Sequence, residues 1–113
     1  LGLNMDPVNF IKDLDTAYNN TNLINEFYRL VPKNIIGCHA KDFKIVEGLL
    51  PHFEETTIGS KYSMLDNDAL LKGLNKINPS AHVLIEHLPD QEIPKALTGL
   101  NNVAKKNKII WDN

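Results

Sequence analysis

Three short apolar segments, each ending in a side chain that can bind a metal ion, constrain this chain more than any other feature. The segments and their polar ends are 1–6 with Asp6, 34–39 with His39, and 81–88 with Glu86. Each is short and flanked by turn or helix signals, as buried strands are. In parallel α/β folds the carboxyl ends of the strands form one face, and that face carries the chemistry. The sequence therefore predicts a set of nitrogen and oxygen ligands for a divalent metal.

Helical spacing of apolar residues fills most of the chain between these segments. It predicts amphipathic helices over 23–31, 69–77 and 96–104, the second capped by Asp66 and the third opening at Pro89–Asp90. The polar stretch 18–22 is predicted to be a loop. Residues 43–47 and 52–57 are predicted to form a hairpin, with Glu54 and Glu55 on its solvated face. The order of elements predicts an α/β fold with a parallel sheet and right-handed crossovers.

The composition of the chain argues against some classes of binding partner and indicates a cellular compartment. The chain of 113 residues has a formal net charge of −2, which suits neither a nucleic-acid surface nor a membrane surface. It has no apolar run long enough to span a membrane, and we expect neither a transmembrane helix nor a signal peptide. The single cysteine, Cys38, fits a reducing cytoplasm. Strand alternation turns Cys38 away from His39, so we expect a buried, inert thiol.

The predicted sheet is too small to be covered on both faces or to close on itself. Three parallel strands cannot form a barrel, and a bare first strand exposes an edge that invites aggregation. Two interpretations remain open at this point. Residues 1–113 are the C-terminal portion of a longer barrel whose N-terminal part covers the edge, or another copy of the chain covers it.

Four motifs together resemble the C-terminal part of the xylose-isomerase-like sugar phosphate isomerase/epimerase superfamily. They are Asn4–Asn9, His39–Asp42, Ile58–Ser60 with Leu65–Asp66, and Ile85–Leu88, in the family's order and spacing. The resemblance implies that residues 1–113 form the C-terminal part of a (β/α)8, or TIM, barrel, with the hairpin as an addition. The family's arginine shortly after the metal histidine has no counterpart near Lys44.

The resemblance also implies a metal centre and a reaction. Asp6, His39 and Glu86 match metal ligands of the family, which holds one divalent ion. We expect Mn²⁺ foremost, with Mg²⁺, Co²⁺ or Zn²⁺ as alternatives. Glu86 would also act as catalytic acid and base. The family's first glutamate ligand would precede Leu1, so we expect residues 1–113 to be inactive alone.

The implied reaction moves a proton next to the carbonyl of a sugar or sugar phosphate through an enediolate. A metal stabilises the charge on the carbonyl oxygen, and a positioned carboxylate takes the proton. Asn9 lies where related enzymes contact substrate. Lys41 and Asp42 are predicted either to contact substrate or to pair with each other, and His87 lies beside Glu86 as a further candidate for the substrate site.

Each ligand candidate also has a simpler interpretation. Asp6 before Pro7 can start a turn, and His39 alone suits a hydrogen-bonded interior histidine. Glu86 at the end of an apolar strand needs a partner or a metal. Other functions remain open on the same fold: a lyase similar to inosose dehydratase, a metal-dependent endonuclease, or a binding module without catalysis.

Overall fold

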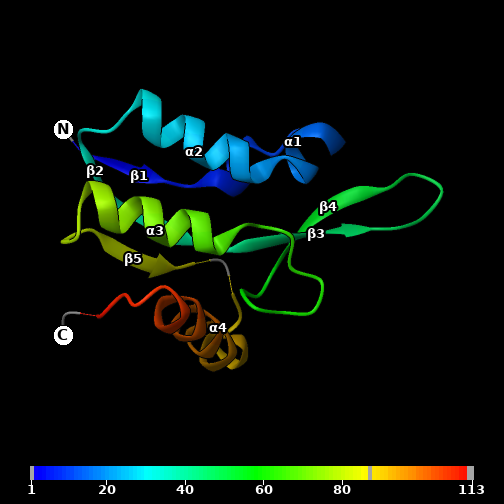
Figure 1. The fold of residues 1–113 in the computed structure, drawn as a ribbon. Helices are drawn as coiled ribbons and strands as arrows, with labels where there is room; N and C mark the ends of the chain where they lie inside the picture. Colours follow the sequence, from blue (N-terminus) through cyan, green and yellow to red (C-terminus); the bar gives the residue numbers. More distant parts are fainter. Residues whose placement is uncertain (1, 87, 112–113) are drawn as a thin grey trace.

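The computed structural model describes residues 2–86 and 88–111, and Figure 1 shows their arrangement. A parallel sheet has the strand order β1–β2–β5, and a separate antiparallel hairpin consists of β3 and β4. The strands are β1 (Leu3–Met5), β2 (Ile35–Ala40), β3 (Asp42–Val46), β4 (His52–Thr56) and β5 (His82–Ile85). The helices are α1 (Leu14–Tyr18), α2 (Asn20–Leu30), α3 (Asn67–Ile77) and α4 (Ile93–Lys106). Two short 3-10 helices, η1 (Pro7–Phe10) and η2 (Asp90–Glu92), complete the described elements.

The sheet is parallel, as the alternation of strands and helices predicted. Both β1 and β5 pair with β2, which leaves them as the two edges of this sheet. The register aligns Met5 with Cys38 and Cys38 with Val83. The three strands therefore reach their carboxyl ends side by side. The mixed α/β class and the hairpin are confirmed, with β3 and β4 within one residue of the predicted bounds.

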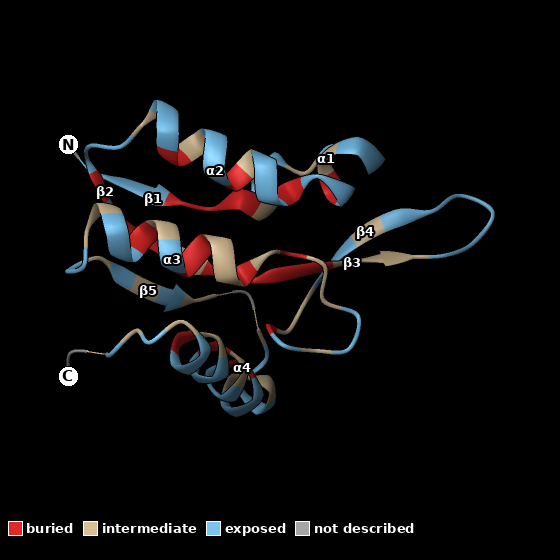
Figure 2. Cartoon of the chain, in the orientation of Figure 1, coloured by how far each residue is buried: buried red, intermediate tan, exposed pale blue. Residues whose placement is uncertain are grey.

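Two clusters of apolar side chains hold the helices to one face of the sheet. The first joins Met5 and Cys38 of the strands to Ile24 of α2 and Leu70 of α3. The second lies between the 58–71 region and α4, and Val83 and Ile85 pack against it. Figure 2 shows this buried layer beneath the exposed outer sides of the helices. Burial raises the pKa of the Cys38 thiol to about 12, with a smaller contribution from the charge of Asp6.

The opposite face of β5 is open. His82 and Leu84 are exposed, whereas Val83 and Ile85, which alternate with them, are half-buried. Parallel sheets in proteins are covered on both faces. None of the helices in the described part of the chain is long and apolar enough to cross a membrane.

Two predicted boundaries were wrong. The polar stretch 18–22 is not a loop, because α1 ends at Tyr18 and α2 begins at Asn20. Asn20 is buried and donates to the carbonyls of Ala17 and Met64, which fixes the corner between the helices. At the other end of the chain, η2 precedes α4, which begins at Ile93 instead of at Pro89–Asp90. The predicted cap is confirmed: Asp66 accepts a hydrogen bond from the backbone N–H of Ala69.

Candidate metal centre

The three predicted ligands meet at the carboxyl end of the parallel sheet. Asp6 follows β1, His39 lies near the end of β2, and Glu86 follows β5. One ligand atom from each lies within 4.8 Å of the other two. Asp6 is buried, and His39 and Glu86 are half-buried. The strand register explains this convergence, because it places the end of each strand beside the next.

His39 lies between the two carboxylates. Its Nδ1 atom is 3.3 Å from Oδ2 of Asp6 and 3.2 Å from Oε2 of Glu86. A neutral imidazole nitrogen can donate one hydrogen bond or bind one metal ion, and protonation makes the ring a cation. The same atom is therefore placed either to pair with both carboxylates or to share a metal ion with them.

Lys41 supplies a cation at the same point. Its side chain is only 2% exposed, and Nζ lies 3.1 Å from Oδ2 of Asp6, 3.3 Å from Oε1 of Glu86 and 3.4 Å from Oε1 of Glu55. Burial by itself lowers the pKa of Lys41, but hydrogen bonds to Asp6 and Glu86 and the charges of Asp6 and Glu55 outweigh it and raise the pKa. Lys41 is therefore a buried, charged ammonium group. The sequence also allowed a pair between Lys41 and Asp42, but Lys41 pairs with Asp6, Glu86 and Glu55 instead.

Asn9 orients Asp6. Its Nδ2 donates to Oδ2 of Asp6 at 3.0 Å, and its Oδ1 accepts from Nζ of Lys41 at 3.4 Å. The second oxygen of Asp6, Oδ1, is buried and has no hydrogen-bond partner. A buried carboxylate oxygen without a donor is costly unless a cation reaches it. This orphaned oxygen fits the prediction of a metal ligand at Asp6.

The charges at the centre suit a divalent cation. Among the described residues, Asp6, Glu86 and Glu55 contribute three negative charges, and Lys41 contributes one positive charge. With His39 neutral, the formal balance of these described side chains is −2, which one divalent ion would neutralise. Carboxylates with one imidazole are a donor set for Mn²⁺, Mg²⁺ or Co²⁺ more than for a metal that prefers thiolates.

The hydrogen bonds of Asp42 favour a structural role over the contact with substrate or the pair with Lys41 that the sequence left open. Its carboxylate is fully buried and accepts five hydrogen bonds. The donors are the backbone N–H groups of Phe43, Met64 and Leu65, the Ser63 hydroxyl and the Asn67 amide. Burial raises the pKa of Asp42, and these hydrogen bonds oppose the shift. The geometry favours Asp42 as the anchor that holds residues 63–67 against β3.

Glu55 is the functional candidate that sequence reasoning missed. It was predicted to lie on the solvated face of the hairpin, yet its carboxylate reaches Nζ of Lys41. A signal was available, because alternation in β4 places Glu55 on the same face as Phe53, and Phe53 packs against the main core. His87, predicted to support the substrate site, lies outside the described residues.

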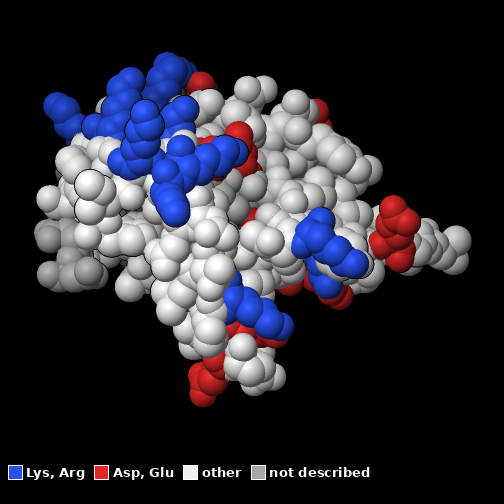
Figure 3. All heavy atoms as spheres, turned by 60° about the horizontal axis from the view of Figure 1, so that its bottom comes forward, with Lys and Arg blue, Asp and Glu red and all other residues white. Residues whose placement is uncertain are grey.

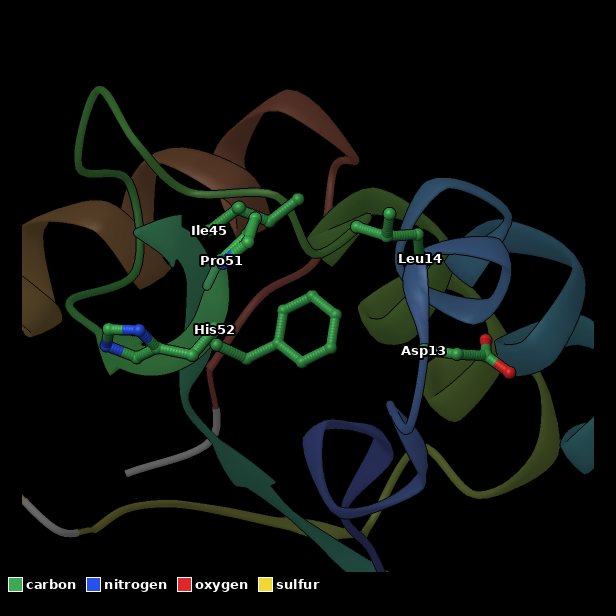
Figure 4. Close-up of a pocket in the computed structure, with 6 residues that line it drawn as sticks. Asp13, Leu14, Ile45, Pro51 and His52 are labelled. Atoms are coloured by element: carbon green, nitrogen blue, oxygen red, sulfur yellow. The ribbon is translucent and has the colours of Figure 1, made fainter. Parts of the chain in front are cut away.

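Two hollows lie away from this centre. Figure 4 shows a small one, of about 250 Å³, where Ile45, Pro51 and His52 of the hairpin region approach Asp13 and Leu14. A larger groove of about 740 Å³ lies between β5, the helices α3 and α4, and residues 109–111. Neither hollow contains a predicted ligand or substrate residue.

Basic side chains gather at the opposite end of the molecule. In Figure 3 most Lys and Arg side chains on the visible face lie toward the end where the strands begin. The last turns of α2, α3 and α4 carry Arg29, Lys76 and Lys105–Lys106, which complement the helix dipoles.

Comparison of the chain with protein-family models, with curated proteins and with solved structures found no significant match. The centre must therefore be interpreted from its own geometry and charge.

Proposed function

We propose that this chain is the metal-binding part of a (β/α)8-barrel isomerase or epimerase that acts on a sugar or sugar phosphate. The observation that carries the proposal is the meeting of Asp6, His39 and Glu86 at the carboxyl end of three parallel strands. Active sites of barrels with this strand direction occupy that end. The buried oxygen of Asp6 without a hydrogen-bond partner gives independent support for a cation there.

The open face of the sheet supports the barrel part of the proposal. His82 and Leu84 of β5 are exposed, and β1 and β5 both present free edges within the three-stranded sheet. In a barrel, the inner face is covered by the remaining strands, and closure removes both edges. The proposed cover is the remainder of such a barrel, with a second copy of the chain as the alternative.

The residues of the centre divide the chemistry between them. Asp6, His39 and Glu86 would hold one divalent ion, with Mn²⁺ the foremost candidate. When bound, such an ion stabilises negative charge on a substrate carbonyl oxygen as a Lewis acid. Glu86 is half-buried, and its carboxylate would both hold the ion and exchange the proton next to the carbonyl. Asn9 orients Asp6 through its hydrogen bond, and the substrate contact predicted for Asn9 remains part of the proposal.

A binding module without catalysis is the second candidate, and the position of Lys41 favours it. The ammonium group already pairs with Asp6 and Glu86, so the carboxylates have a cation without any metal. In that case Asp6, His39, Lys41 and Glu86 form a structural polar network. Metal binding separates the two candidates.

Calorimetric titration with Mn²⁺ tests the proposal. We expect one Mn²⁺ per chain, with binding weakened at least about a hundredfold by His39→Gln and by Glu86→Gln, because each substitution removes a ligand. His52→Gln is the matched control, since His52 is an exposed histidine on the hairpin. A short polyol hydroxamate, which mimics an enediolate, should bind only to the Mn²⁺-loaded protein. Equal Mn²⁺ affinity in all four proteins would contradict the metal centre.

A further inference from the structure

Lys41 and a divalent metal ion would require the same two carboxylate groups. Nζ of Lys41 contacts Oδ2 of Asp6 and Oε1 of Glu86. Those two residues are also two of the three candidate ligands. Two cations held by the same two carboxylates repel each other at short range, more strongly in a buried site than in water.

Glu55 gives Lys41 a separate partner. It comes from β4 of the hairpin and not from the parallel sheet, and its carboxylate lies 3.4 Å from Nζ of Lys41. Its side chain is 40% exposed, whereas that of Asp6 is 11% exposed, so Glu55 has more freedom to move with the ammonium group. A lysine side chain has several rotatable bonds, so it can change partners without a change in the backbone.

We propose that Lys41 is an internal counter-ion that a divalent metal displaces from Asp6 and Glu86, and that Glu55 retains it after displacement. This inference rests on the proposed metal centre. Lys41 keeps its proton throughout; only its partners change. Before metal entry, Lys41 neutralises the carboxylate cluster and holds the two ligands in place. After metal entry, the Lys41–Glu55 pair remains and joins the hairpin to the occupied site.

The displacement makes Lys41 a residue that sets metal affinity. A metal ion must give up part of its binding free energy to separate Lys41 from two carboxylates. Removing the ammonium group should therefore tighten metal binding, although the residue bears the charge that stabilises the metal-free fold. Removing Glu55 should weaken metal binding, because displaced Lys41 then lacks a partner.

The test is a double-mutant cycle read out by the dissociation constant for Mn²⁺. We expect Lys41→Met to tighten Mn²⁺ binding about tenfold and Glu55→Gln to weaken it about threefold, as expected for changes in charge-assisted hydrogen bonds. In the Lys41→Met background, Glu55→Gln should weaken Mn²⁺ binding clearly less than in the wild-type background. If Glu55 acted only through its own negative charge, its substitution would weaken binding equally in both backgrounds, and the proposal would fail.

A second pair on the same hairpin provides the control. Lys44 lies 3.9 Å from Glu54, and both side chains are substantially exposed. Lys44→Met on β3 and Glu54→Gln on β4 make the same changes of charge, yet neither residue pairs with Asp6 or Glu86. We expect each to change Mn²⁺ affinity less than twofold. A change as large as that of the Lys41 variant would show a general effect of charge and overturn the proposal.

The outcomes separate this inference from the proposed function. If the wild-type protein binds Mn²⁺ and Lys41→Met binds it no more tightly, the counter-ion role is refuted and the metal centre stands. If only Lys41→Met binds Mn²⁺, the counter-ion role holds and the native protein is not a metalloenzyme. If neither binds, both ideas fail. Should Lys41→Met not fold, the ¹⁵N resonance of the Lys41 ammonium group in the wild-type protein decides: it must shift on titration with Mg²⁺, and no shift refutes displacement.

Discussion

Replacing Asp42 by alanine should destabilise the fold severely, although the sequence predicted for Asp42 either a contact with substrate or a pair with Lys41. The carboxylate accepts hydrogen bonds of 2.8 Å from Phe43 N and Leu65 N, and both of these residues are themselves buried. The Ser63 hydroxyl and the Asn67 amide donate at 2.6 Å each. The Met64 N–H and the Asn67 amide each have a second acceptor, the carbonyls of Phe43 and Leu65. The loss of an acceptor on substitution by alanine therefore falls mainly on the backbone N–H groups of Phe43 and Leu65.

The magnitude follows from the buried donors. An unsatisfied buried donor costs about 1–3 kcal/mol, so the two buried backbone N–H groups alone account for about 2–6 kcal/mol. Burial penalises the charged carboxylate of Asp42, which is why its pKa is raised. Removing the carboxylate removes this penalty and so offsets part of the cost. We therefore expect Asp42→Ala to lower the free energy of unfolding by about 4 kcal/mol, a large part of the ~5–15 kcal/mol typical of a domain.

Urea denaturation followed by circular dichroism measures this loss, with two companion variants. Ser63→Ala removes one donor and should cost only about 1 kcal/mol. Asp42→Asn keeps one acceptor oxygen but turns an amide donor toward other donors, so it should fall between the two. A loss below about 1 kcal/mol for Asp42→Ala would refute the structural role and return Asp42 to the substrate site.

Two further substitutions test the packing of α4 and the pH dependence of stability. Gly99→Ala should destabilise the protein by about 1–3 kcal/mol in the same denaturation assay, against the gain that helix propensity predicts, because the added Cβ would lie 2.1 Å from the carbonyl oxygen of Ile58; an increase in stability would contradict this close approach. Asp68 accepts a hydrogen bond from Lys106, which lowers the pKa of Asp68 in the folded state. Its contribution is therefore present above the unfolded pKa and lost as pH falls through the folded pKa, so Asp68→Asn should cost at most about 1 kcal/mol at pH 7 and nothing near pH 2; a constant difference across this range would contradict the linkage.

The parallel sheet and the ligand positions could be predicted because they depend on local pattern. Each strand is a short apolar run, and the last polar side chain of each run lies at the end of its strand. Once the strands are parallel, Asp6, His39 and Glu86 must share one edge of the sheet. The predicted reaction came only from the resemblance of the motifs to a barrel family, and it stays a proposal.

The helix boundary at Asn20 could not be predicted, because tertiary contacts decide it. Asparagine-rich stretches favour turns through side-chain hydrogen bonds to nearby backbone. Here the Asn20 amide instead donates to the carbonyl of Met64, and its oxygen accepts from the backbone N–H of Asp66. The partners lie more than forty residues away in the sequence. No local window contains them, so propensity alone gives a loop.

The pairing of Lys41 with Glu55 has consequences beyond the missed assignment. A buried lysine is tolerated only because several carboxylates surround it, and the same carboxylates are the candidate ligands of a metal ion. The metal-free fold and the metal therefore depend on the same two carboxylates, those of Asp6 and Glu86. A substitution that strengthens the ion pairs of Lys41 with Asp6 and Glu86 should therefore have two effects. It should stabilise the metal-free protein, and it should weaken metal binding. Among variants at this position, the free energy of unfolding of the metal-free protein and the affinity for metal would then change in opposite directions. A polar network with only a structural role does not predict this correlation.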